Sequence, residues 1–327
     1  MGSDLSGKAG ISSQGRLPKV SIGMPVYNGE AFIRAALDSL LAQTFADFEL
    51  IISDNVSTDA TEKICRHYAA LDPRIRYYRN DVPIGPMENF NRLIDLAVAP
   101  YFMWAAHDDV RDSSFIDCLV RALDTHPQAV LAFTGFDNID DQGKRVRTFG
   151  EKWSEIMTSS KFRQYWAMTL FDEAQTQKAN APIYGLMHRE VLRGCGGMMS
   201  IPRVIFCGED VLALLRLLAL GNFVVVDRVL FHYRVRSHMT RPDNQSVGEY
   251  LIRRGLKQMP GHRGSLSLYL TRNYAYHREM RRIVMRNAPF SLMGKIVLWV
   301  LILVKEYLGP LKTIPQAVCH ELGFMQK

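Results

Sequence analysis

The chain has 327 residues, of which 47% are hydrophobic and 22% are charged. This composition is typical of a globular protein and excludes a disordered chain, a collagen-like repeat and a small disulfide-bonded scaffold. The five cysteines are scattered without a C-x-x-C pair, which favours reduced thiols in a cytosol over disulfides or a zinc site. Residues 1–17 are small and polar at their start, which predicts a flexible leader and no signal peptide.

The formal net charge of +7 does not indicate nucleic-acid binding, because it belongs to one end of the chain. Residues 251–327 hold 13 Lys and Arg against 3 Asp and Glu, whereas the first 250 residues hold 27 basic and 30 acidic side chains. A nucleic-acid-binding domain would interleave its basic residues with aromatic ones on a compact surface. We therefore expect no nucleic-acid partner.

Strand-like and helix-like segments alternate from residue 19 onward. The patterns predict helices over residues 31–43, 61–68, 86–97 and 114–125, and strands over residues 19–26, 48–53, 75–78, 101–106 and 129–136. A mixed region follows, then a helix after residue 210 and two short strands that we expect to pair with each other, 223–226 and 229–235. This order predicts an α/β fold with a mostly parallel sheet, whose ligands bind at the carboxyl ends of the strands.

Acidic residues follow two of these predicted strands. Asp54 ends the second strand, and Asp108 and Asp109 end the fourth. Adjacent carboxylates that leave a buried strand are costly to desolvate unless a cation neutralises them, and Mg²⁺ or Mn²⁺ suits oxygen ligands. The alternative is that one of the pair caps the helix that begins near Ser114. The first strand is not followed by G-x-G-x-x-G, and the chain has no Walker A loop, which argues against a dinucleotide or NTPase site.

Several motifs in order resemble family 2 glycosyltransferases. They are KVSIGMPVYNG at 19–29, LLAQTF at 40–45, FELIISDN at 48–55, Ile84-Gly85 with Asn89 and Asn91, and His107-Asp108-Asp109 in place of D-x-D. The resemblance covers about residues 18–140, extends weakly to Gly208-Glu209-Asp210 and Tyr233-Arg234, and does not cover the tail. It implies an inverting, nucleotide-sugar-dependent enzyme with a GT-A domain over 18–240, while composition predicts a basic helical region over 241–327.

The resemblance also assigns roles to individual residues. It implies that Asp54 accepts a hydrogen bond from the base edge, although a turn-forming aspartate before Ser57 is the alternative. It implies that Asp109 coordinates the metal on the diphosphate, with His238 as a further metal residue. The predicted nucleotide-binding residues are Pro25, Val26, Tyr27, Asn28, Asp54, Asn55, Asn89 and Asp108, of which the first three form a wall for the base.

An inverting transfer needs a general base for the acceptor hydroxyl. The resemblance places it in Glu209-Asp210, and we choose Asp210 with Glu209 as the reserve. The alternative is an acidic pair that stabilises the start of a helix through its dipole. Because neither Asp109 nor Asp210 is missing, an enzyme is favoured over a non-catalytic sugar-nucleotide or glycan-binding protein on the same fold.

The expected reaction is the transfer of a hexosyl or N-acetylhexosaminyl group, assisted by Mn²⁺ or Mg²⁺, from a nucleotide-diphosphate donor to a glycan or lipid-linked acceptor. A UDP-sugar is the expected donor because Asp54 suits the uracil edge, while GDP and dTDP stay open. The reaction would belong to polysaccharide or glycolipid biosynthesis. Whether the chain forms an oligomer is also left open.

The C-terminal region predicts a peripheral contact with the inner face of the cell membrane, through residues 278–308. A cluster of Arg278, Arg281, Arg282 and Arg286 precedes an apolar run at 296–304 that contains Trp299. Nine apolar residues are too few to span a bilayer, which needs about 20, but a basic approach and an apolar helix suit its interface. The alternative is a helix buried against the catalytic domain or a dimer partner.

Overall fold

The computed structural model describes residues 16–149, 153–170, 181–198, 208–235, 264–304 and 306. The chain divides into two compact units. Unit 1 comprises Met1–Thr158, Ala181–Met198 and Leu220–His238, and unit 2 comprises Ser159–Asn180, Met199–Ala219 and Met239–Lys327. The chain passes between the two units at several points, and the single boundary near residue 240 stays a prediction.

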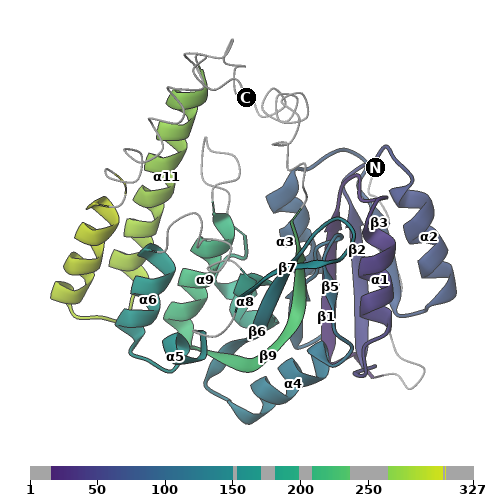
Figure 1. Ribbon diagram of the computed structural model, residues 1–327, viewed down its shortest axis with the longest axis horizontal. Helices are drawn as coiled ribbons and strands as arrows, with labels where there is room; N and C mark the ends of the chain where they lie inside the picture. Colours follow the sequence, from purple (N-terminus) through teal and green to yellow (C-terminus); the bar gives the residue numbers. More distant parts are fainter. Residues whose placement is uncertain are drawn as a thin grey trace. The chain divides into compact units, whose positions relative to one another are not determined.

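The first half of unit 1 is a parallel sheet with connecting helices (Figure 1). Its strands lie in the order β3-β2-β1-β4, and they confirm the first four predicted strands: β1 (Val20–Val26), β2 (Phe48–Asp54), β3 (Ile75–Arg79) and β4 (Tyr101–Trp104). All seven residues of β1 and all seven of β2 are buried, as expected for strands covered on both faces. The connecting helices are α1 (Ile33–Leu41), α2 (Thr61–Leu71) and α3 (Pro86–Leu96).

The second half of unit 1 extends the same sheet in the order β4-β8-β6-β9-β5, with β7 paired to β6. Strand β8 runs antiparallel to both of its neighbours, so β6 and β9 run parallel to β1, and the carboxyl ends of these strands lie at one edge. The strands are β5 (Val110–Arg111), β6 (Ala129–Ile139), β7 (Arg145–Phe149), β8 (Leu186–His188) and β9 (Asn222–Arg234). The other elements here are α4 (Phe115–Thr125), α5 (Trp153–Met157), η1 (Ala181–Tyr184) and α8 (Arg189–Gly194).

The prediction of two paired strands at 223–226 and 229–235 is wrong, because β9 is one continuous strand parallel to β6. Thr134 lies opposite Val226 and Gly135 lies opposite Val229, so Asp227 and Arg228 form a bulge. A two-residue hairpin favours residues such as Asn-Gly that adopt positive φ. Asp-Arg lacks that property, and the chain bends through a bulge without reversing.

Unit 2 is helical in its described part. Its helices are α6 (Lys161–Leu170), α9 (Glu209–Leu220), α11 (Gly264–Asn287) and a further helical stretch over residues 292–304. The Tyr165 hydroxyl donates to the Leu215 carbonyl at 2.9 Å, and the Tyr165 ring packs on Phe290 with 5.1 Å between centroids. Helix α6 is thereby joined both to α9 and to the turn between the two C-terminal helices. Among the helices described, none has the length and apolar character needed to cross a membrane.

Candidate functional site

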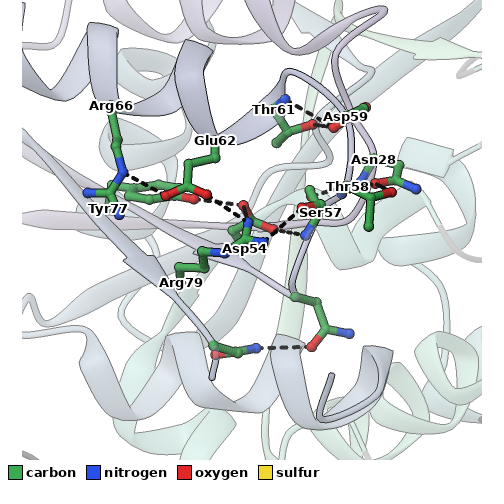
Figure 2. A network of polar contacts seen from close by, with 12 residues as sticks. Asn28, Asp54, Ser57, Thr58, Asp59, Thr61, Glu62, Arg66, Tyr77 and Arg79 are labelled. Atoms are coloured by element: carbon green, nitrogen blue, oxygen red, sulfur yellow. Dashed lines mark hydrogen bonds and ion pairs between the residues drawn. The ribbon is translucent and has the colours of Figure 1, made fainter. Parts of the chain in front are cut away.

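Hydrogen bonds join the loop after β1 to the loop after β2 (Figure 2). The Asn28 side-chain oxygen accepts from Thr58 N at 2.8 Å, and Asn28 N donates to Ser57 Oγ at 2.9 Å. Gly29 N donates to Thr61 Oγ1 at 2.8 Å. Asn28 has φ of 51°, which Asn tolerates better than most residues. The two loops therefore form one hydrogen-bonded border at the carboxyl edge of the sheet.

Tyr27 is the exposed member of the predicted wall for the base. Its side chain is 46% exposed, whereas Pro25 and Val26 are buried within β1. An exposed aromatic ring at this border offers a face for stacking. The wall stays a prediction, and in this geometry Tyr27 would be the residue that contacts a base.

Asp54 is fully buried at the end of β2 and accepts three hydrogen bonds (Figure 2). Its Oδ1 accepts from Ser57 N at 2.7 Å, while its Oδ2 accepts from Tyr77 Oη at 2.7 Å and Arg79 Nη1 at 3.0 Å. Burial and the hydrogen bond to Asp54 raise the pKa of the Tyr77 phenol, which keeps its proton. A carboxylate offers about four acceptor positions, so the three bonds fix Asp54 and leave one position.

The sequence analysis did not identify Tyr77 and Arg79 as partners of Asp54. The predicted parallel order of the strands pointed to them, because it sets the end of one strand beside the end of the next. Strand β3 pairs with β2 in a register that sets Arg79 opposite Asp54. Arg79 also pairs with Glu62 at 3.2 Å, which links the end of β3 to the first turn of α2. A basic residue that ends the neighbouring strand is the expected partner for a buried strand-end acid.

Asn55 and Asn89 lie in a buried amide network below this border. Asn89 Oδ1 accepts from Ser53 Oγ at 2.7 Å and from Asn80 Nδ2 at 3.1 Å, and Asn89 Nδ2 donates to Ser53 O at 2.8 Å. Asn55 Oδ1 accepts from Asn80 Nδ2 at 3.0 Å and from Ile84 N at 2.9 Å. The network anchors the segment before α3 to the end of β2. Direct nucleotide contacts of Asn55 and Asn89 stay a prediction.

Asp109 carries a buried oxygen without a hydrogen-bond partner. The residue is 1% exposed; its Oδ1 accepts from Arg234 N at 2.9 Å, while its Oδ2 is unsatisfied. Burial and the neighbouring Asp108 raise the pKa of Asp109 to about 8, although Arg111 and Arg234 act in the opposite direction. Asp109 therefore does not cap α4, and a cation would satisfy its second oxygen.

Arg234 holds the segment that contains Asp108 and Asp109. Its Nε donates to Asp108 O at 2.9 Å and its Nη1 to Asp140 O at 2.6 Å, and its guanidinium lies 4.7 Å from the Phe32 ring centroid. This one side chain connects the loop after β4, the turn after β6 and the segment before α1. The Arg234 backbone N–H contacts the Asp109 carboxylate itself, so Arg234 holds this segment through both its side chain and its backbone.

His107 packs against the loop after β1. A Cβ built on Gly29 would lie 2.7 Å from His107 Cδ2, so only glycine allows this approach. The structure thus brings three segments that are far apart in sequence to the carboxyl edge of one sheet within unit 1: Tyr27–Gly29, Asp54–Ser57 and His107–Asp109.

The donor set fits a divalent metal that is shared with a substrate. Three His, Cys, Asp or Glu side chains do not cluster anywhere among the described residues. Mg²⁺ typically uses one or two protein carboxylates and completes its shell with water and substrate phosphates. The unsatisfied Asp109 Oδ2, with Asp108 beside it, meets that requirement. His238 lies outside the described residues.

Glu209 and Asp210 lie in unit 2, at the start of α9. Gly208 before them has φ of 78°, and a Cβ there would lie 2.7 Å from the Tyr276 ring. Glu209 is 4% exposed, whereas Asp210 is partly exposed and accepts from Val211 N through Oδ1 at 2.8 Å. Of the two residues, Asp210 is the more exposed, and the choice between them as the base stays a prediction.

Val56 adopts a strained backbone within the loop after β2. Its φ of 68° is in the left-handed region, which costs a β-branched residue roughly 1–2 kcal/mol. We expect Val56→Gly to raise the free energy of unfolding by about 0.5–1 kcal/mol, because the extra chain entropy of glycine offsets part of the gain. Thermal unfolding should show Tm higher by about 1–3 °C.

A matched control for that variant is Val82→Gly. Val82 is 61% exposed and is not among the non-glycine residues with positive φ in the described chain. Its replacement should lower Tm or leave it unchanged. Equal changes in Tm for both variants would contradict the strain at Val56.

Comparisons with known proteins agree with this architecture. The sequence profile described as "Glycosyl transferase family 2" matches residues 21–194. The uncharacterized glycosyltransferase RT0329 of Rickettsia typhi is 33% identical over 126 residues, which are 38% of each chain. The uncharacterized protein y4gI of Sinorhizobium fredii is 33% identical over 130 residues, 39% of this chain and 14% of that protein. This chain thus matches well under half the length of either relative.

Solved structures show the same fold. TarS of S. aureus, residues 1–349 in complex with UDP, superposes with a TM-score of 0.60 over 88% of this chain and 72% of TarS, at 16% identity. That likeness identifies the GT-A architecture: the α/β sheet with Asp54 at the end of β2 and Asp109 in the segment between β4 and β5. Because the family profile covers more than half of the residues, the chain belongs to glycosyltransferase family 2.

Proposed function

We propose that this chain is an inverting glycosyltransferase that moves a sugar from a nucleotide-diphosphate donor to an acceptor hydroxyl. The observation that carries the proposal is the unsatisfied, buried Asp109 oxygen at the edge of the sheet that also carries Tyr27 and Asp54. A nucleotide diphosphate presents a base and a chelating diphosphate. This edge offers the Tyr27 ring and the Asp54 carboxylate for the base, and Asp109 for a metal on the diphosphate. The family membership supports the reaction class.

The proposed donor is a UDP-sugar. Asp54 retains one acceptor position after its three internal hydrogen bonds, and the N3–H group of uracil is a matching donor. Tyr27 would stack on the ring of the base. TarS has been solved with UDP and with UDP-GlcNAc, which supports uridine here and leaves hexosyl and N-acetylhexosaminyl transfer as the two donor classes to test.

Asp109 and Asp108 would hold Mn²⁺ or Mg²⁺ together with the donor diphosphate. The ion, when bound, supplies positive charge that stabilises the leaving nucleoside diphosphate. The protein contributes the position of the carboxylate, through Arg234 N on Asp109 Oδ1 and Arg234 Nε on Asp108 O. We propose Asp210 as the base that takes the proton from the acceptor hydroxyl, because its carboxylate is partly exposed.

We place the enzyme in the cytoplasm, at the inner face of the cell membrane, with a glycan or lipid-linked acceptor in polysaccharide or glycolipid biosynthesis. Cys65, Cys118 and Cys195, in the part of the chain that the structure describes, are not joined in disulfides, which supports a reducing compartment. A lipid-linked acceptor would follow from attachment to a membrane.

Donor turnover tests the proposed function directly. We expect nucleoside diphosphate release from UDP-sugars with Mn²⁺ or Mg²⁺, and none after chelation. Asp54→Asn should raise KM for the UDP-sugar by about tenfold, because a hydrogen bond to a charged carboxylate becomes one to a neutral amide, a difference of about 1.5 kcal/mol. Exposed Asp81→Asn, on the loop after β3, is the matched control and should leave KM unchanged. Tight nucleotide binding without turnover of any donor would favour the non-catalytic binding protein.

A further inference from the structure

The helical stretch over residues 292–304 has an exposed apolar face. Its residues recur at helical spacing and have exposed fractions of 41–69%: Leu292, Met293, Ile296, Val297, Val300 and Val304, together called the outer apolar face. The opposite side of the same helix holds Leu298 and Ile302, both fully buried. A helix that is apolar on all sides is typical of one that is covered on all sides.

The inner side of this helix is already packed within unit 2. Arg281 on α11 forms a buried ion pair with Glu306, and its guanidinium lies 5.5 Å from the Trp299 ring centroid. Phe290, in the turn before the helix, packs on the rings of Phe162 and Tyr165. These contacts fix which side of the helix faces inward, so the outer apolar face is the side that remains for a partner.

A stripe of basic side chains lies where the outer apolar face begins. Arg278, Arg282 and Arg286 are exposed and recur every four residues along α11; they are called the basic stripe. Lys295 Nζ donates to Met285 O at 3.1 Å, so the start of the apolar helix lies beside the end of the stripe. Within this part of the described chain the acidic neighbour is Glu279, which pairs with Arg282 at 2.8 Å. The combined surface is apolar and positive.

We propose that the outer apolar face and the basic stripe dock on the surface of an anionic lipid bilayer. The apolar side chains would enter the boundary between headgroups and acyl chains, and the arginines would contact the headgroups. Such a helix lies in the plane of the interface, so it need not be long enough to span the bilayer. This inference rests on the membrane location put forward in the proposed function and names the surface that makes the contact; it does not depend on the sugar transfer.

Charge favours this partner over a second copy of the chain. Interfaces between identical subunits are depleted of charged residues at their centre, and a self-complementary contact here would bring two basic stripes together. An anionic leaflet instead neutralises them. The outer apolar face is then buried in the leaflet, and the basic stripe is attracted to the anionic headgroups.

Flotation of the full-length protein with vesicles tests the proposal. We expect it to float with vesicles that contain anionic phosphatidylglycerol and to stay in solution with neutral phosphatidylcholine vesicles. Replacing the basic stripe in Arg278→Gln, Arg282→Gln, Arg286→Gln should lower partitioning by about 10²-fold, from the usual contribution of three basic residues at an anionic surface. Val297→Glu with Val304→Glu should abolish flotation, because both residues lie on the outer apolar face.

A matched control changes exposed apolar residues in unit 1. Leu71 and Val146 are 72% and 65% exposed, and Leu71→Glu with Val146→Glu adds the same charge elsewhere. This control should float like the wild type, and circular dichroism should show that all variants are folded. Failure of the wild type to float with anionic vesicles would overturn the proposal. So would unchanged flotation of the folded stripe variant, or a concentration-dependent dimer that only the Val297→Glu, Val304→Glu variant loses.

Discussion

Asp109→Asn should make the metal-free protein more stable above pH 8 and at the same time remove its metal-dependent donor binding. Burial and Asp108 raise the pKa of Asp109 to about 8, whereas an aspartate in an unfolded chain has a pKa of about 4. The folded state therefore holds a proton that the unfolded state loses, and wild-type stability falls as the pH rises from about 4 to about 8. Asparagine does not titrate, so the variant avoids this loss.

The gain in the free energy of unfolding should exceed about 1 kcal/mol at pH 8.5 and vanish near pH 4, because one pKa unit corresponds to about 1.4 kcal/mol. Thermal unfolding in a chelator across this pH range measures it. Asp227→Asn is the matched control, since Asp227 is an exposed aspartate on β9 and should show no such gain. A variant with unchanged stability at both pH values would show that Asp109 is not desolvated as described.

The Asp109→Asn variant also tests metal binding. Because a metal must displace the proton, the affinity of wild type for Mn²⁺ with UDP should rise with pH up to about 8. Asp109→Asn should lose that affinity, which calorimetric titration would measure directly. A variant that binds Mn²⁺ and UDP as tightly as the wild type would contradict the metal role of Asp109.

The elements of the first half were predictable because their local patterns are strong. Strands β1 and β2 are apolar runs buried over their whole length, and α1 buries Ile33, Ala36, Leu37 and Leu40 at helical spacing. Asp54 was located in the same way, as the last residue of β2, whereas β4 ends at Trp104, short of the predicted end at residue 106, and Asp109 lies between β4 and β5. Local periodicity thus located the elements of the fold, while the roles of the acids stay predictions.

What sequence reasoning missed depends on strand register and on contacts between distant segments. The partners of Asp54, which are Tyr77 and Arg79, lie more than 20 residues away and meet it through the β2–β3 register. Arg234 lies 125 residues beyond Asp109 and meets it only because β9 ends beside the loop that follows β4. Residues 227–228 look like a turn until the partner strand β6 is known. No local pattern carries this information.

The second large effect is expected at the start of α9. Asp210→Asn should lower kcat by at least about 10²-fold with little change in donor affinity, which is the usual scale for the loss of a general base. The change is nearly isosteric, and the asparagine oxygen can still accept the hydrogen bond that Val211 N makes to Asp210 Oδ1 at 2.8 Å. The fold should therefore survive, and kinetics with a donor and an acceptor hydroxyl would measure the proton-accepting function alone.

Glu209→Gln is the matched control, because it removes one acidic charge from the same first turn of α9. Each replacement should lower the free energy of unfolding by roughly 0.3–1 kcal/mol through the helix dipole. We therefore expect the two variants to lose similar amounts of Tm and to differ in kcat. Glu209 is 4% exposed, and a substrate hydroxyl has little access to it, so its variant should keep most of the wild-type kcat. A dead Glu209→Gln beside an active Asp210→Asn would move the base to Glu209. If both variants stayed active, the acidic pair would serve only to stabilise the start of the helix.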